Sequence, residues 1–287
     1  MNNIRNLKEK VLIVIPIINN YKIFKDSFYT KNNLENRKSE TISLVRALNV
    51  NVLDVLTIKI NKFSSAYLFN KNSLDCILEL IKKLKINLLI IDFQLSPIQQ
   101  RNLELFFKVK VIDRTQVILE IFSSRAISNE GKIQVELAAL NFQKTRLVRS
   151  WTHLERQRGG SGFLGGPGER QIELDRRIIN KNIKNLNASL QKVVKTRSIQ
   201  NSKRKNSSSI IVSLVGYTNT GKSTLFNNLT NSSVISKNML FATLDPTLRL
   251  MKHEMSYKNK IILSDTVGFI SSLPTELVES FKRSEEH

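Results

Sequence analysis

The sequence predicts an α/β protein in three parts: a parallel-sheet domain, a helical hairpin and an incomplete doubly wound domain. Three observations support this prediction. Short apolar runs alternate with helical patterns up to about residue 125, which is typical of βα units that build a parallel sheet covered by helices. Two long helical patterns then flank a glycine-rich break. After residue 210 an apolar run enters a glycine-containing loop and another helix. We place the parts at 1–125, 126–200 and 210–287, with a linker at 201–209.

The elements of the first part follow from periodicity and capping signals. Ser96-Pro97 has the sequence of a helix start, with Ser as N-cap and Pro at the first helical position. Four-residue or longer runs of β-branched and aliphatic residues predict strands. The expected helices are Thr41–Leu48 and Ser73–Leu84, the latter with Ser73 as N-cap, and the expected strands are Val11–Ile18, Val52–Ile60, Ala66–Phe69, Leu88–Phe93 and Val109–Ile112.

Cysteine usage and hydropathy indicate the compartment. The one cysteine, Cys76, excludes a disulfide within the chain and lies among apolar residues, so we expect it in the core of a protein from a reducing compartment. The longest apolar run, Val11–Ile18, contains Pro16 and is far shorter than the roughly 20 residues that span a bilayer. Polar residues follow it instead of a small-residue cleavage site. We therefore expect a cytoplasmic protein without a membrane span, with loose membrane association as an alternative.

Positive charge is concentrated in the helical part. The chain has 45 Lys/Arg against 24 Asp/Glu, a net charge of +21, and residues 141–206 alone hold 16 Lys/Arg against 4 Asp/Glu, a net +12. Nine of those sixteen are Arg, whose planar guanidinium suits forked phosphate contacts. We expect a polyanionic partner, RNA before a membrane. The alternatives are a Lys-rich composition without functional meaning, and charges that merely cover two solvated helix faces.

A phosphate-binding motif follows the apolar run that starts at Ile210. Residues 216–223, Gly-Tyr-Thr-Asn-Thr-Gly-Lys-Ser, match G-x-x-x-x-G-K-[ST], and they stand between a predicted strand and a predicted helix, as this motif requires. The loop N–H groups and the helix N-terminus would point at phosphates. Lys222 would reach the β- and γ-phosphates, and Ser223 would supply a hydroxyl to Mg²⁺. A glycine turn that simply precedes a helix is the alternative.

Two later segments extend this candidate site. Ile261–Asp265 has the pattern of a buried strand, which would bring Asp265 to the Mg²⁺ shell. Gly268, three residues later, could turn its N–H to the γ-phosphate. Between the two motifs, Thr243 offers a hydroxyl that could complete the metal shell. A lone D-x-x-G is weak evidence, but after a phosphate loop and a strand it supports the same site.

These motifs and others along the chain resemble those of the HflX-type GTPases, a branch near the Obg group of translation GTPases. The resemblance covers nearly everything after about Leu88, and the first 87 residues are much less diagnostic. The matching segments are LSPIQQRNLE (95–104), VIDRT (111–115), GKIQVELA (131–138), WTHLERQRGG (151–160), GGPGE (165–169), ELDRR (173–177), VGYTN (215–219), FATLDPT (241–247) and DTVGF (265–269).

The resemblance implies a G domain, a P-loop fold that hydrolyses GTP with Mg²⁺, in a monomeric protein that binds the large ribosomal subunit and its rRNA. Family members are associated with splitting or rescuing ribosomes. Matching the motifs assigns catalysis to Lys222, Thr243 and Gly268, with Thr247 the less favoured switch threonine, and Mg²⁺ binding to Ser223, Thr243 and Asp265. RNA contacts fall to Arg156, Arg158, Arg170, Arg176 and Arg177. The guanine nucleotide would contact Gly216, Tyr217, Thr218, Asn219, Thr220, Gly221, Lys222, Ser223, Thr224, Phe241, Ala242, Thr243, Leu244, Asp265, Thr266, Val267 and Gly268.

Several features depart from the family's pattern. Phe269 stands where many GTPases have a Gln that orients water, and a phenyl ring cannot do so, which leaves catalysis to Mg²⁺, Lys222, loop N–H groups and a group supplied from elsewhere. Arg170 stands where many members have Thr. From Ile210 to His287 the chain has 78 residues and no N-K-x-D guanine motif. The alternative is therefore a truncated, hydrolysis-incompetent fragment that binds ribosomes or RNA. An ATP-using N-terminal domain has no Walker-type loop before residue 216 to support it.

Overall fold

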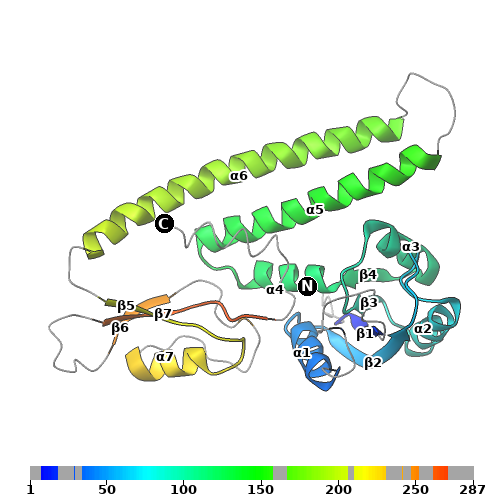
Figure 1. The fold of residues 1–287 in the computed structure, drawn as a ribbon, viewed down its shortest axis with the longest axis horizontal. Helices are drawn as coiled ribbons and strands as arrows, with labels where there is room; N and C mark the ends of the chain where they lie inside the picture. The colour runs from blue at the N-terminus through cyan, green and yellow to red at the C-terminus, as the bar shows by residue number, and fades with distance from the viewer. Residues whose placement is uncertain are drawn as a thin grey trace, which may run out of the picture. The chain divides into compact units, whose positions relative to one another are not determined.

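The computed structural model describes residues 8–18, 29, 34–157, 167–205, 210–230, 241, 247–251 and 261–270. The chain divides into two compact units, residues 1–120 with 148–158, and residues 121–147 with 159–287. Figure 1 traces the elements in chain order. The first unit holds β1 (Lys10–Ile18), α1 (Leu34–Arg46), β2 (Asn51–Ile60), α2 (Lys71–Leu84), β3 (Leu88–Ile91), α3 (Pro97–Phe107) and β4 (Lys110–Asp113); α4 (Arg114–Arg125) and α5 (Asn129–Gln157) contribute to both units.

The first unit is built on a four-stranded parallel sheet. The strand order is β2-β1-β3-β4, and the register sets Val11 opposite Leu88 and Leu88 opposite Lys110. Residues 11–18 of β1 are all buried, because a central strand of a parallel sheet is covered on both faces. The predicted α/β class is confirmed.

The two faces of this sheet are covered by different helices. Leu12 and Val14 of β1 share one core cluster with Ile77 of α2 and Leu103 of α3. Helix α1 packs on β1 and β2 through buried residues that include Leu44. Since α1 and α2 follow β1 and β2 in right-handed crossovers of opposite direction, they lie on opposite faces. Each fully buried aliphatic side chain stabilises the unit by about 1.5–3 kcal/mol.

The helix start predicted at Ser96 is confirmed. The Ser96 hydroxyl accepts from the Gln99 N–H at 3.2 Å, and the Gln99 side chain accepts from the Ser96 N–H at 3.0 Å. Pro97 occupies the first turn. This reciprocal capping box fixes the point where the chain leaves β3 and enters α3.

Two predictions about α2 were wrong. Asn70 caps the helix, with its side-chain oxygen accepting from the Ser73 N–H at 2.9 Å, so Ser73 lies inside the first turn. Asn caps as well as Ser does, and it stands three residues earlier. Cys76 is exposed, because the buried stripe of α2 runs through Leu74, Ile77 and Ile81. A residue one position before Ile77 is rotated about 100° away from that stripe.

The strand predicted at Ala66–Phe69 was also wrong. The chain makes a compact turn in which the Ser64 and Leu68 backbones bond to each other, with Leu68 at a φ of 69°. Side-chain amides of α3 hold this turn: Gln99 donates to the Ser64 carbonyl at 3.0 Å and Asn102 to the Ala66 carbonyl at 3.0 Å. Carbonyls that are satisfied in this way need no strand partner.

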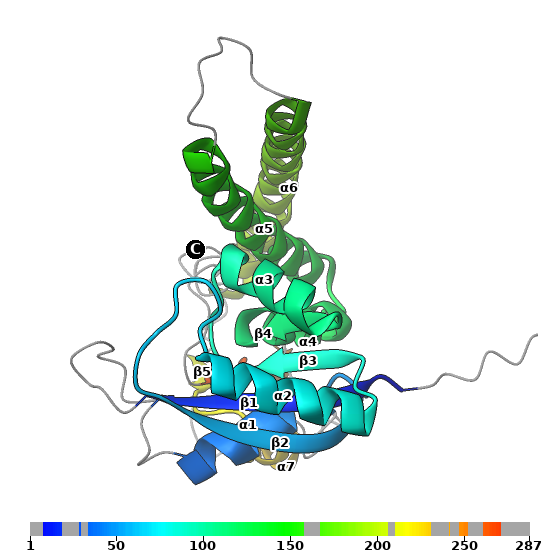
Figure 2. The same cartoon turned by 90° about the vertical axis from the view of Figure 1, so that its right-hand side faces the viewer.

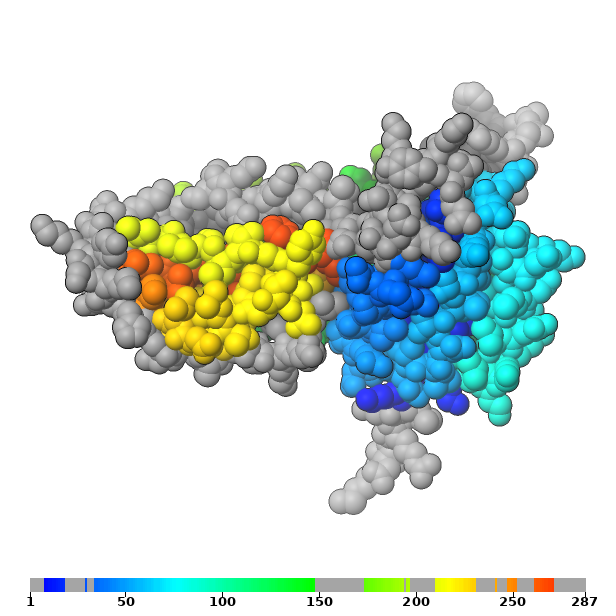
Figure 3. Space-filling model, turned by 60° about the horizontal axis from the view of Figure 1, so that its bottom comes forward, coloured from blue at the N-terminus to red at the C-terminus, as the bar shows by residue number. Residues whose placement is uncertain are grey.

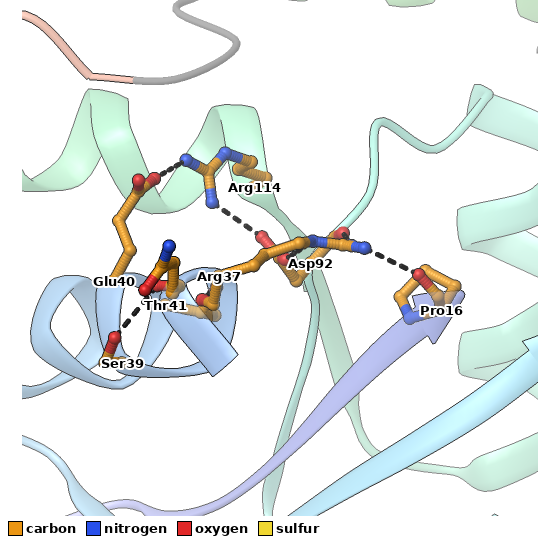
Figure 4. A network of polar contacts seen from close by, with 8 residues as sticks. Pro16, Arg37, Ser39, Glu40, Thr41, Asp92 and Arg114 are labelled. Carbon is orange, nitrogen blue, oxygen red and sulfur yellow. Dashed lines mark hydrogen bonds and ion pairs between the residues drawn. The ribbon is translucent and has the colours of Figure 1, made fainter. Parts of the chain in front are cut away.

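A buried ionic cluster ties the carboxyl ends of the strands to the helices (Figure 4). The Arg37 guanidinium donates to the Asp92 carboxylate at 2.6 Å and to the Pro16 carbonyl at 2.7 Å. Arg114, the first residue of α4, donates to the other Asp92 oxygen at 2.7 Å and also pairs with Glu40. Burial works to lower the pKa of Arg114, but the charges of Asp92 and Glu40 outweigh it and raise the pKa above the ordinary value.

The second unit joins a helical pair to a small sheet. Helix α6 (Pro167–Lys205) runs alongside α5 in both views (Figures 1 and 2). It ends inside the segment 201–209 that the sequence assigned to a linker. β5 (Ile210–Leu214), α7 (Lys222–Thr230), β6 (Thr247–Leu250) and β7 (Ile261–Asp265) follow, in a sheet of order β5-β7-β6. Of the helices that the structure describes, none combines the length and apolarity needed to cross a membrane.

We predict that Asp92→Asn destabilises the first unit by about 3–5 kcal/mol, because two buried guanidinium groups then lack a charged partner. Urea unfolding with hydrogen exchange of the β1 and β3 peptides measures this free energy. Glu35→Gln is the control, since Glu35 makes an exposed pair with Lys38 at 3.4 Å, and it should cost under about 1 kcal/mol. Equal losses in the two variants would contradict a structural role for the cluster.

Candidate functional site

The candidate phosphate loop connects β5 to α7, as its motif predicted. Gly221 has a φ of +85° and Asn219 a φ of 61°, so the chain passes through the left-handed region twice before Lys222 opens the helix. Glycine adopts this backbone without strain, and asparagine tolerates it better than most residues. The yellow residues of β5, the loop and α7 are exposed on the face drawn in Figure 3, and the Tyr217 ring is 64% exposed.

Lys222 lies folded over its own loop. Its ammonium group donates to the Gly216 carbonyl at 3.0 Å and to the Tyr217 carbonyl at 2.5 Å. Partial burial lowers the pKa of Lys222, and the negative charge of Asp265 opposes that shift. The side chain therefore places a cation at the mouth of a loop whose amide groups suit phosphate oxygens.

Ser223 and Asp265 meet between α7 and the end of β7. The Ser223 hydroxyl donates to the Asp265 carboxylate at 2.7 Å, and the parallel register sets Asp265 beside Leu214, the last residue of β5. The Thr266 hydroxyl donates to the Leu214 carbonyl at 2.7 Å, which fixes the chain just after Asp265. Asp265 is fully buried.

These two oxygen donors fit Mg²⁺. A magnesium ion in a phosphate site is bound by one or two protein oxygens together with substrate phosphates and water, not by a cage of protein ligands. Over the part of the chain that the structure describes, no group of three His, Cys, Asp or Glu side chains is placed to form such a cage. The donor set of Ser223 and Asp265 agrees with that chemistry.

The segment after β7 is attached to the phosphate loop by its backbone. The Phe269 N–H donates to the Gly216 carbonyl at 3.0 Å, and the Phe269 carbonyl accepts from the Thr218 N–H at 2.8 Å. Gly268 packs so closely that a Cβ on it would lie 2.7–2.8 Å from the Thr218 backbone. Only glycine fits between these two segments.

The structure brings together the two motifs that the sequence assigned to one site, and it describes part of the third. Phe241 is buried, whereas Ala242, Thr243 and Leu244 lie outside the described residues. Thr247, the less favoured switch threonine, stands opposite Asp265 in the antiparallel register of β6 and β7. Thr224 is exposed in the first turn of α7.

The arginines proposed for RNA contact are described in part. Arg176 and Arg177 are exposed on α6, and Arg177 pairs with Glu173 at 2.6 Å across one helical turn. An exposed pair of this kind contributes little to stability, so it leaves Arg177 available to a polyanion. The side chains of Arg156, Arg158 and Arg170 lie outside the described part of the chain.

Sequence reasoning missed two contributions to this site. The backbone of Phe269 binds the phosphate loop, and main-chain groups have no residue signature. The Thr266 hydroxyl holds the end of β5, and the signal for it was a hydroxyl directly after the strand's terminal Asp265. Both contacts depend on the pairing of β5 with β7.

Three family models match consecutive parts of the chain. They are described as the N-terminal region of a GTP-binding GTPase over residues 35–123, the middle region of a GTP-binding GTPase over residues 125–204, and a 50S ribosome-binding GTPase over residues 211–287. The second and third models cover the helical pair and the phosphate site.

Curated relatives match over most of the chain. It is 48% identical over 245 residues to the GTPase HflX of Magnetococcus marinus, which covers 85% of this chain and 56% of the relative. It is 46% identical over 240 residues to the GTPase HflX of Escherichia coli strain K12, which covers 84% of this chain and 56% of the relative. The chain thus spans about 56% of the length of these relatives.

Solved structures show the same fold. A GTP-binding protein from the hyperthermophilic archaeon Sulfolobus solfataricus, in complex with GDP, aligns with a TM-score of 0.50 and 24% identity, over 96% of this chain and 66% of that one. At this identity the likeness concerns the fold.

We predict that Gly268→Ala destabilises the nucleotide-free second unit by about 1–3 kcal/mol, because its Cβ would press on the Thr218 backbone. Gly216→Ala is the matched control, since a Cβ there would meet Thr220 only at an ordinary 3.5 Å. Differential scanning calorimetry without nucleotide compares the two. If Gly216→Ala lowered the melting temperature as much as Gly268→Ala does, the close packing would not be the cause.

Proposed function

Because the chain belongs to the HflX family of GTPases, we propose that it is a ribosome-associated enzyme that binds the large ribosomal subunit and hydrolyses GTP with Mg²⁺. We propose further that it acts in ribosome splitting or rescue, in the cytoplasm and as a monomer. The relatives' names and the description of the matching family as 50S ribosome-binding support the first statement.

The observation that carries this proposal is the convergence of three groups at one sheet edge. Lys222 lies over the phosphate loop, and Ser223 is 2.7 Å from Asp265. A cation for phosphate, a hydroxyl and a carboxylate for a hard metal, and a loop of amides are the recurring parts of a phosphoryl-transfer site. A glycine turn that only precedes a helix would need none of these side chains.

Each group then has a role in hydrolysis. Lys222 would leave the loop carbonyls and neutralise charge on the β- and γ-phosphates, and the Gly268 N–H would bind an oxygen of the γ-phosphate. Ser223 and Asp265, with Thr243, would hold Mg²⁺, which neutralises phosphate charge when it is bound. The Phe269 ring cannot orient the attacking water, so we propose that another group, supplied on the ribosome, does so.

The helical pair would bind rRNA. The segment 141–206 has a net charge of +12, and on α6 the structure places Arg176, Arg177, Lys181, Lys184 and Lys192 at exposed positions. Phosphate contacts from such residues release counterions, so binding weakens steeply with salt. Recognition of folded RNA by shape and backbone suits an elongated basic element.

We predict that the chain binds fluorescent GDP and GTP, that excess ATP competes poorly, and that Lys222→Ala weakens binding at least 100-fold by removing the phosphate cation. Lys83→Ala is the control, since Lys83 is an exposed lysine of α2, and it should bind as the unaltered chain does. Large ribosomal subunits should still bind the Lys222→Ala variant. Unchanged nucleotide affinity in Lys222→Ala would sink the enzyme proposal.

We predict that the double variant Arg176→Gln with Arg177→Gln weakens binding to large ribosomal subunits. It should reduce the slope of log affinity against log salt by about 1.4–1.8, because two phosphate contacts are lost. Lys82→Gln with Lys83→Gln removes the same charge from exposed positions of α2 and should leave the slope nearly unchanged. Equal reductions in both variants would mean that net charge alone, and not α6, determines binding.

A further inference from the structure

The main chain after β7 forms a short ladder with the phosphate loop. The Phe269 N–H donates to the Gly216 carbonyl at 3.0 Å, and the Thr218 N–H donates to the Phe269 carbonyl at 2.8 Å. Together these bonds make a parallel bridge between Tyr217 and Phe269. The ladder lies beyond the regular strands, and it joins two segments that both belong to the proposed nucleotide site.

This ladder uses a donor that the loop would otherwise offer to phosphate. Thr218 is inside the G-x-x-x-x-G-K-[ST] motif, whose amides form an anion-binding concavity. In the structure its N–H meets the carbonyl oxygen of Phe269, an acceptor of the same kind as a phosphate oxygen. A ligand oxygen that approaches this amide must first displace Phe269.

The obstacle concerns the terminal phosphate in particular. Gly268 is the residue whose N–H is proposed to bind the γ-phosphate, and it is pressed against Thr218, with no room even for a Cβ. The contacts of Lys222 and Ser223 lie on the other side of Gly221, toward α7. GDP can therefore reach the loop amides next to α7 while the ladder stays closed, but a third phosphate meets the closed ladder.

From this geometry we infer that the backbone of Phe269 is a latch that sets the preference between GDP and GTP. The inference rests on the proposed function and adds a specificity determinant to it. GDP binds with the ladder closed, and GTP binds only to molecules in which it has opened. The apparent GTP affinity is then reduced by the fraction of molecules that are open. Because one net backbone hydrogen bond of about 1 kcal/mol corresponds to roughly a fivefold change, removal of one bond should be measurable.

The latch belongs to the main chain and not to the phenyl ring. The Phe269 side chain is 54% exposed, and both bonds of the ladder are made by its peptide groups. Proline at 269 would keep the carbonyl and remove the N–H that Gly216 accepts. Phe269 is not among the residues with positive φ, and the preceding Gly268 has no side chain to collide with a proline ring. Alanine at 269 would remove the ring and keep both bonds.

The test compares Phe269→Pro and Phe269→Ala in the full chain, by titration with GDP and with GTPγS. We expect Phe269→Pro to raise the affinity for GTPγS relative to GDP about fivefold, and Phe269→Ala to leave the ratio unchanged. Equal ratios in both variants would overturn the latch, as would loss of both nucleotides in Phe269→Pro alone. Failure of the unaltered chain to bind GDP would instead refute the proposed function.

A measurement on the unaltered chain does not depend on how the variants fold. Hydrogen exchange is followed at the Thr218 and Phe269 amides without nucleotide, with GDP and with GTPγS. We expect protection in the first two states and at least tenfold faster exchange with GTPγS, whose third phosphate opens the ladder. Equal protection in all three states would overturn the inference.

Discussion

The parallel pairing of β5 with β7 is the constraint on which the phosphate site depends. It aligns Leu214 with Asp265, so the loop that follows β5 and the carboxylate that ends β7 emerge at the same edge of the sheet. Every contact of the site builds on that alignment: the Ser223 hydroxyl reaches Asp265, and the Thr266 hydroxyl reaches the Leu214 carbonyl. A register shift of one residue would turn Asp265 to the opposite face of the sheet.

The first unit uses the same geometry for a different purpose. The carboxyl ends of its parallel strands also meet at one edge, and there Asp92 binds Arg37 and Arg114 in a buried cluster. Ligands bind at such edges in many α/β folds. Here two guanidinium groups take the position, and their hydrogen bonds to Asp92, Glu40 and the Pro16 carbonyl join α1, α4 and the strand ends. Buried charges of this kind are costly to break and define one arrangement of the elements around them.

Much of the fold could be predicted from sequence, because strand runs and the Ser96-Pro97 helix start are local signals. The turn around Leu68 could not, since α3 amides of Gln99 and Asn102 stabilise it from a distance in sequence. The burial of Cys76 was misjudged because apolar neighbours do not reveal which helical face a residue occupies. For the site, the motif identified Lys222 and Ser223, but the main-chain ladder at Phe269 appears only once β5 and β7 are paired.

The central claim is that the edge formed by β5, β7 and α7 holds a nucleotide and its metal. A crystal structure of the chain grown with GDP and Mg²⁺ tests it most directly. The account predicts the β-phosphate on the loop amides and the Lys222 ammonium, with the Ser223 hydroxyl moved from the Asp265 carboxylate onto the metal. GDP bound elsewhere, with Lys222 still on the Gly216 and Tyr217 carbonyls and the Ser223–Asp265 bond intact, would contradict it.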